Sequence, residues 1–211
     1  MGVQYEYFSI TWTDVLASVL AATLAELAFS NVLSRSGVPR RLFFPESALA
    51  AAFGIGIFLR GTSPWVFACA AFLAVASKYL IRIKGRHIFN PSNFGIVSLV
   101  YFVPFAATIE FTQWGVSRPL IIVVSCIALV IAYRAGVIVT TGSFLISYTV
   151  LLLLFVGLDP FYFAVHHLGL LSPSIILFAS FMITDPRTSP ASFWGRILHG
   201  CTVAALYFVL E

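Results

Sequence analysis

Two polar stretches interrupt an otherwise apolar sequence, and both contain residue types that could hold a ligand. One runs from Lys84 to Gly95 and the other from Thr184 to Pro190. In the first, Asn90-Pro91 disfavours helix at Asn90 and makes Pro91 a favourable first residue of a new helix. A helix start has unpaired N–H groups and a partial positive charge, so it favours an anionic or electron-rich group. The alternative is an ordinary cytoplasmic loop with a proline start.

The side chains in these two turns offer amide, hydroxyl and charged groups, and we expect both turns to contribute to one ligand site. Asp185 would lie at the C-terminal end of a helix, where the dipole disfavours it unless it is paired. The alternative is that both turns only cap helices, with Thr188 or Ser189 capping a helix opened by Pro190. No catalytic residue and no metal site are predicted. The six predicted ligand-binding residues are Asn90, Asn93, Thr184, Asp185, Arg187 and Thr188.

The composition indicates an integral membrane protein of the all-α class. Of the 211 residues, 60% are apolar and only 9% are charged, whereas a soluble domain has roughly 25% charged residues. Membrane lipid is therefore an expected partner. The net charge of +4 is assigned to loops, so no nucleic-acid binding is expected.

Apolar windows of roughly 20 residues predict the membrane-spanning helices. There are eight such windows in one transmembrane domain covering residues 1–211. If they cross in alternating directions, nine arginines and lysines fall on one side, whereas only Arg60 and Arg118 fall on the other. This asymmetry predicts basic loops in the cytoplasm and both termini outside. The predicted helices are 11–34, 42–60, 63–83, 92–109, 118–133, 136–157, 168–184 and 190–210.

A short internal echo predicts an inverted-topology repeat. Thr-Ser-Pro occurs at 62–64 and again at 188–190. This offset pairs three helices of a first half, about 11–109, with three oppositely directed helices of a second half, about 118–211. In such proteins a ligand site tends to form between the halves. The second half is expected to be shorter than the first.

Glu26 and Lys78 are among the charged residues that lie within predicted helices. Glu26 is surrounded by apolar residues, and an ionisable group at that depth is a functional candidate by default. The alternative is a neutral Glu26 that is hydrogen-bonded to a neighbouring helix. Lys78 lies near a helix end, and we expect it to extend its ammonium group to the membrane surface.

Several of these motifs resemble one family of membrane proteins, the RnfD/NqrB family. It includes the D subunit of the Rnf electron-transport complex and the B subunit of sodium-translocating NADH:quinone oxidoreductase. The Phe89-Asn90-Pro91 stretch resembles its Asn-x-Phe-Asn-Pro-Ala segment, and the sequence from Phe181 to Pro190 resembles its Phe-Met-Ala-Thr-Asp-Pro-Val-Thr-Ser-Pro motif. Glu26 and Glu46-Ser47-Ala48 lie where the family has Thr-Glu and Asp-Gly-Ser-Ala.

The resemblance implies a short variant of an inverted-repeat protein that lacks the family's first and last helices. It also implies a bacterial inner membrane location, partner subunits and a role in redox-linked ion pumping. The family carries covalent flavin on a threonine in a Ser-Gly-Ala-Thr segment, and here the nearest sequence is Phe105-Ala106-Ala107-Thr108. We therefore expect non-covalent FMN or riboflavin, or a quinone, and no flavin on Thr108. Two alternatives remain open: a small-solute or ion transporter or channel, and a structural subunit without a cofactor.

Overall fold

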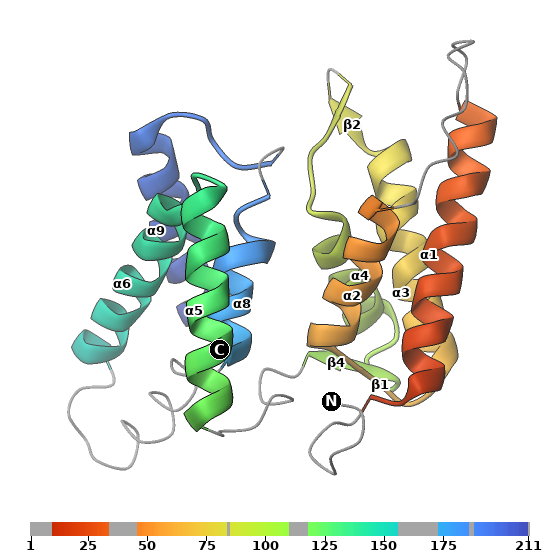
Figure 1. Ribbon diagram of the computed structural model, residues 1–211, viewed down its shortest axis with the longest axis horizontal. Coiled ribbons are helices and arrows are strands. Elements are labelled where there is room, and N and C mark those ends of the chain that lie inside the picture. The colour runs from red at the N-terminus through yellow and green to blue at the C-terminus, as the bar shows by residue number, and fades with distance from the viewer. Residues whose placement is uncertain are drawn as a thin grey trace. The chain divides into compact units, whose positions relative to one another are not determined.

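The computed structural model describes residues 10–33, 46–83, 85–109, 118–155, 173–185 and 188–210. The chain divides into two compact units, Met1–Gln113 and Trp114–Glu211, which are described separately below. Both are mostly helical (Figure 1).

The first unit contains four helices whose directions alternate (Figure 1). Helix α3 packs against each of the other three. Its contact face is built from small residues, among them the buried Ala70, Ala71 and Ala74. Small residues allow helix backbones to approach closely in a membrane. At Gly95 of α4 this approach is so close that an added Cβ would collide with the carbonyl oxygen of Ala70. The four helices are α1 (Trp12–Leu33), α2 (Glu46–Phe58), α3 (Pro64–Leu80) and α4 (Pro91–Phe102).

Two small antiparallel sheets lie at opposite ends of this helix bundle (Figure 1). Strand β1 (Leu59–Gly61) pairs with β4 (Ala107–Ile109), and β2 (Arg82–Ile83) pairs with β3 (Arg86–His87) through a turn with Gly85 at φ +79. The structure is mostly helical, which agrees with the predicted all-α class, but these four short strands were not predicted.

The two sheets also shorten two predicted helices. The helix predicted at 92–109 ends at Phe102, and Pro104 disfavours helix at Val103, whose backbone is not helical (φ -135, ψ 56). The helix predicted at 63–83 ends at Leu80, before β2 begins. In both cases the strand contains apolar residues, Ile83 in β2 and Ala107 and Ile109 in β4. Apolarity alone therefore did not show where the helix ends.

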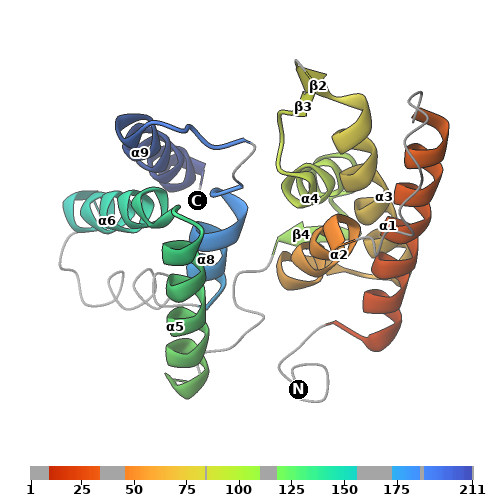
Figure 2. The same cartoon turned by 45° about the horizontal axis from the view of Figure 1, so that its top comes forward.

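The second unit contains α5 (Arg118–Arg134), α6 (Ile138–Phe155), α8 (Pro173–Leu177), the π-helix η2 (Phe178–Met182) and α9 (Phe193–Leu210). Helices α6 and α9 lie side by side (Figures 1 and 2). A Cβ added at Gly200 of α9 would lie 2.7 Å from the carbonyl oxygen of Thr140 in α6. Further along the same two helices, the core contains an aromatic cluster that includes Phe144, Tyr148 and Tyr207.

Large apolar side chains cover much of the surface of both units. Along α1, four leucines spaced three or four residues apart are 50–65% exposed: Leu16, Leu20, Leu24 and Leu27. Among the described helices, Trp12–Asn31 and Ile138–Phe155 are long and apolar enough to cross a membrane, and only 22% and 28% of their hydrophobic windows are buried. The other apolar helices are shorter. Such exposure in water would be costly, and lipid removes that cost.

Candidate functional site

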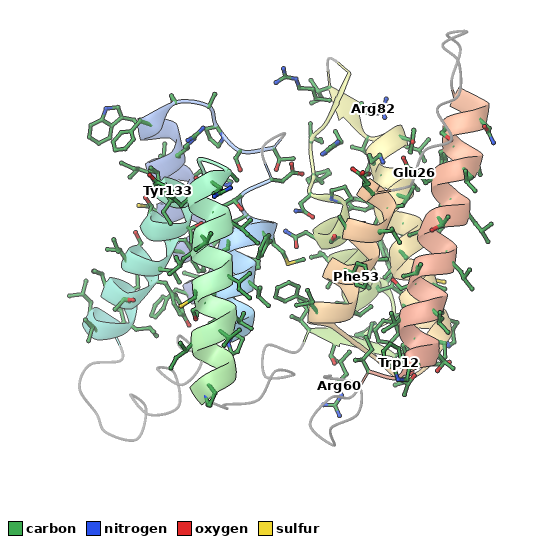
Figure 3. The ribbon with its side chains drawn as sticks, in the orientation of Figure 1. Trp12, Glu26, Phe53, Arg60, Arg82 and Tyr133 are labelled. Atoms are coloured by element: carbon green, nitrogen blue, oxygen red, sulfur yellow. The ribbon has the colours of Figure 1, made fainter. Side chains whose placement is uncertain are left out.

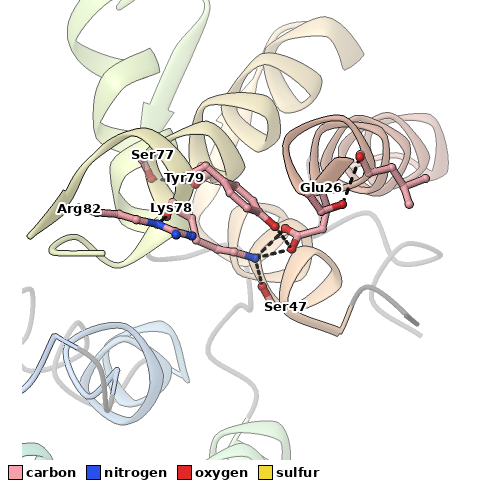
Figure 4. A network of polar contacts seen from close by, with 9 residues as sticks. Glu26, Ser47, Ser77, Lys78, Tyr79 and Arg82 are labelled. Atoms are coloured by element: carbon pink, nitrogen blue, oxygen red, sulfur yellow. Dashed lines mark hydrogen bonds and ion pairs between the residues drawn. The ribbon is translucent and has the colours of Figure 1, made fainter. Parts of the chain in front are cut away.

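The most concentrated polar cluster in the first unit surrounds Glu26. The Lys78 ammonium nitrogen lies 2.7 and 2.6 Å from the two carboxylate oxygens of Glu26. The two side chains are only 13% and 18% exposed. Figure 4 shows the pair joining α1 to the last turn of α3. The prediction that Lys78 extends to the membrane surface is therefore wrong, and Glu26 forms an ion pair with it.

The cluster continues into a third helix. The Tyr79 hydroxyl donates a hydrogen bond of 2.7 Å to Glu26, and Lys78 donates one to the Ser47 hydroxyl of α2. The Lys78 ammonium group and the Arg82 guanidinium group lie 5.1 and 5.0 Å from the centre of the Tyr79 ring. The family resemblance drew attention to both Glu26 and Ser47 but not to their contact through Lys78, and sequence reasoning missed Tyr79. The arrangement compensates the charge of Glu26 and ties three helices together at one end of the unit.

Charged side chains lie at both ends of the first unit. Figure 3 shows Glu26 and Arg82 at one end and Trp12 and Arg60 at the other. Because α4 also begins at the Glu26 end (Figure 1), the polar cluster and the Asn90-Pro91 turn share that end of the bundle.

The structure confirms that a helix starts at Pro91 with Asn90 as its cap. The Asn90 side-chain oxygen accepts a hydrogen bond of 3.3 Å from the Asn93 N–H. Ser92 is buried and donates to the carbonyl oxygen of Ala51, which fixes the helix start against α2. The half-buried side-chain amide of Asn93 has no hydrogen-bond partner among the described residues. Helix capping therefore explains why an asparagine is present at position 90. The side-chain amide of Asn93 remains available to a ligand.

In the second unit, the Thr184–Asp185 turn follows the π-helix η2, and π-helical segments occur frequently at functional sites. The buried Thr184 hydroxyl donates to the carbonyl oxygen of Ser180. The N–H groups of Thr188 and Ser189 donate to the Asp185 carbonyl at 3.1 and 2.9 Å. These bonds close a compact turn. Pro186 and the predicted ligand residue Arg187 lie outside the described residues.

Helix α9 starts later than predicted and has a different cap. It begins at Phe193, and Ser192 accepts a hydrogen bond of 3.1 Å from the Gly195 N–H. Capping by Thr188 or Ser189 is therefore wrong, because the Thr188 and Ser189 hydroxyls donate to the carbonyl oxygens of Asp185 and Ile183.

Two residues of α9 contact backbone on either side of the Thr184–Asp185 turn. One His199 ring nitrogen lies 3.1 Å from the Ile183 carbonyl oxygen. Arg196 donates to the carbonyl oxygens of Pro190 and Gly136, and the second of these lies between α5 and α6. Sequence reasoning assigned neither residue to this turn, although their spacing of three residues along one helix places both on the same face.

Two fully buried hydroxyl groups lie near this turn without a hydrogen-bond partner among the described residues: Thr140 Oγ1 and Ser180 Oγ. Thr141, the neighbour of Thr140, donates 3.0 Å to the Ala179 carbonyl, which connects the start of α6 to η2. A buried hydroxyl without a partner costs free energy, so each of these two groups should destabilise the second unit.

The structure therefore places Asn90 and Asn93 together in the first unit, and Thr184, Asp185 and Thr188 together in the second. Whether the two groups form one site stays a prediction. Thr108 lies in β4, opposite Arg60 of β1.

Comparison with known proteins finds similarity to the D subunit of one kind of redox complex. No family model matches the chain. Two curated proteins, from Vibrio vulnificus strains YJ016 and CMCP6, are both named as the D subunit of an ion-translocating oxidoreductase complex. Each is 27% identical to the chain over 123 residues, which are 57% of this chain and 34% of the relative. The matched part thus spans about a third of each relative. The chain is distantly related to the D subunits of ion-translocating oxidoreductase complexes.

Proposed function

We propose that the chain is a membrane subunit of a redox complex, with other subunits as partners. The observation that carries this proposal is the similarity to the D subunits of ion-translocating oxidoreductase complexes. The extensive apolar surface and the two helices of membrane-spanning length support a location in the bacterial inner membrane.

The proposed topology has eight crossings, an inverted repeat and both termini outside. In the first unit the described basic residues Lys78, Arg82 and Arg86 lie at or beyond the end of α3, whereas Arg60 lies at its start. This distribution agrees with a cytoplasmic basic end. The proposed repeat pairs α1, α2 and α3 of the first unit with α6, α8 and α9 of the second. In each set of three, the first helix packs on the third: α1 on α3, and α6 on α9.

The proposed cofactor is a non-covalent flavin, FMN or riboflavin, and a quinone is the alternative ligand. The fit rests on the side chains that retain hydrogen-bonding capacity. The Asn93 amide can both donate and accept, and the N-terminus of α4 favours an electron-rich ring edge. Thr184 and Thr188 already donate to carbonyl oxygens, so their oxygens can only accept from a ligand N–H. When bound, the cofactor supplies the electron chemistry, and the protein contributes orientation and electrostatics.

Purified protein tests this proposal directly. The full chain, extracted in a mild neutral detergent, is expected to show flavin absorption and fluorescence. Acid should release the flavin and leave the protein mass equal to that of the polypeptide. Asn93→Ala should lower flavin occupancy, because losing one hydrogen bond costs about 0.5–1.5 kcal/mol.

Two results would contradict the cofactor part of the proposal. One is colourless protein after purification with its partner subunits, which would favour the structural subunit without a cofactor or the transporter. The other is unchanged occupancy in Asn93→Ala protein of matched stability. Ser63→Ala, at the other end of the first unit, is the control and should retain the flavin.

A further inference from the structure

The hairpin formed by β2 and β3 and the two residues after it make an unusually exposed basic surface. We define the basic hairpin as Arg82, Ile83, Arg86, Ile88 and Phe89. All five side chains are exposed, with Ile83 at 59%, Ile88 at 39% and Phe89 at 47%. His87 of β3 is buried at 8% and holds the hairpin against the unit.

The positive charge of this hairpin is not neutralised by the described part of the protein. No aspartate or glutamate occurs from Tyr79 to Ile109. At this end of the unit, both carboxylate oxygens of Glu26 are already bound by Lys78, and one of them also by Tyr79. Glu46, the first residue of α2, also lies at this end but forms no ion pair with the hairpin arginines in the described part of the protein. Arg86 has no ion-pair partner among the described residues. Both hairpin arginines therefore present charge that an external anion can satisfy.

Arg82 is also held in a fixed position. Its Nε donates 2.6 Å to the Lys78 carbonyl, and its guanidinium group lies 5.0 Å from the centre of the Tyr79 ring. The remaining guanidinium N–H groups stay exposed. A fixed guanidinium group loses less side-chain entropy when it binds an oxyanion, and its fork matches phosphate geometry.

Apolar side chains accompany the two arginines. The strand register places Ile83 opposite Arg86 and Arg82 opposite His87, so each face of the hairpin carries one arginine. The exposed Leu80, at 66%, continues the apolar surface of α3 up to the hairpin. A free phosphate ion would gain nothing from these apolar groups, whereas a phospholipid presents a phosphate directly beside its acyl chains.

We propose that the basic hairpin binds the headgroup of an anionic phospholipid. Arg86 contacts the phosphate, and Ile83 on the same face of the hairpin lies with Ile88 and Phe89 against the upper part of the acyl chains. Arg82, on the other face, adds to the positive charge that attracts the anionic headgroup. This assignment is independent of the proposed redox function, since it depends only on the surface of the first unit.

The test measures lipid binding to full-length protein in dodecyl maltoside micelles. Thermal unfolding is followed during titration with dioleoyl phosphatidylglycerol or dioleoyl phosphatidylcholine, which share acyl chains and differ in charge. The wild-type protein is expected to bind phosphatidylglycerol more tightly. Each arginine near an anionic lipid surface contributes about a fivefold change in affinity. Arg86→Gln should therefore weaken binding about fivefold, and the double variant Arg82→Gln/Arg86→Gln about 25-fold.

Three matched controls separate binding from folding. Arg60→Gln removes one exposed arginine at the opposite end of the unit and should leave the affinity within about twofold. Arg82→Lys keeps the charge and should retain most of the binding even if the bond to the Lys78 carbonyl is lost. Unfolding midpoints measured without lipid show whether the glutamine variants remain folded.

Three outcomes would overturn the proposal. The first is equal affinity of the wild-type protein for the two lipids. The second is unchanged phosphatidylglycerol affinity in the folded double variant, which would leave the charge for an acidic protein partner. The third is displacement of phosphatidylglycerol by an equal concentration of inorganic phosphate, which would identify a free-phosphate site.

Discussion

Replacing Lys78 with methionine should destabilise the protein by leaving the Glu26 carboxylate without its counter-ion. Methionine has a similar length and keeps the packing of the aliphatic stem, so Lys78→Met removes mainly the ammonium group. The Tyr79 hydroxyl would remain as a hydrogen-bond donor to Glu26.

The expected size follows from distance and burial. At 2.6 Å and an effective dielectric constant of about 20, the attraction of the two charges is about 6 kcal/mol before desolvation is subtracted. Breaking a fully buried pair costs about 3–5 kcal/mol, whereas exposed pairs contribute about 0–1 kcal/mol. Since the two side chains are only 13% and 18% exposed, we expect a loss of about 2–4 kcal/mol for Lys78→Met.

A double-mutant cycle isolates this contribution. Glu26→Gln/Lys78→Met leaves no unpaired charge, so the double variant should recover most of the loss and lie within about 1 kcal/mol of the wild type. Equilibrium unfolding in mixed micelles with increasing mole fractions of dodecyl sulfate gives the free energies. If Lys78→Met alone changed the free energy of unfolding by less than about 0.5 kcal/mol, or if the two substitutions were additive, the reasoning would be refuted.

Three further predictions concern the helix contacts and the topology. Gly95→Ala should lower the free energy of unfolding by about 1–3 kcal/mol, because the new Cβ collides with the carbonyl oxygen of Ala70. Gly142→Ala is the control, because its Cβ would meet nothing within 4 Å. Equal effects of the two substitutions in the same unfolding assay would contradict the close contact. Thr140→Val removes a buried hydroxyl without a described partner and should raise the free energy of unfolding by about 1 kcal/mol, whereas a loss of stability would show that the hydroxyl is bound. In protein whose three native cysteines are replaced by serine, Val3→Cys should react with an impermeant maleimide in intact cells and Ile83→Cys should not; the reverse labelling would contradict the proposed orientation.

Helix positions in this chain follow largely from local sequence. Apolar windows and the Asn90-Pro91 pair predicted α1, α5 and the start of α4 to within one residue, because length, apolarity and proline geometry are local properties. The strands were not predicted, since elements of two or three residues at helix ends leave no periodic pattern.

The candidate site was less accessible from sequence than the helices. Glu26 and Lys78 are 52 residues apart, and each was placed correctly in its own helix. Their pairing depends on which faces of α1 and α3 meet, and the strongly apolar helices carry little facial asymmetry that would indicate this. The capping role of Asn90 was predictable because it depends on neighbouring residues, whereas the role of His199 at the Ile183 carbonyl depends on tertiary packing.

The pairing of β1 with β4 gives the first unit an internal reporter of its own assembly. These strands lie just before α3 and just after α4, so they can meet only when the two helices have already docked along their length. Docking brings the strand ends together, and little additional loop-closure entropy is then lost when the ladder forms. The amide of Thr62, which donates 3.0 Å to the Ala106 carbonyl, should thus exchange its hydrogen only when α3 and α4 separate or the ladder frays. The rate at which this amide takes up deuterium therefore sets an upper limit on how often the two helices come apart in the folded protein.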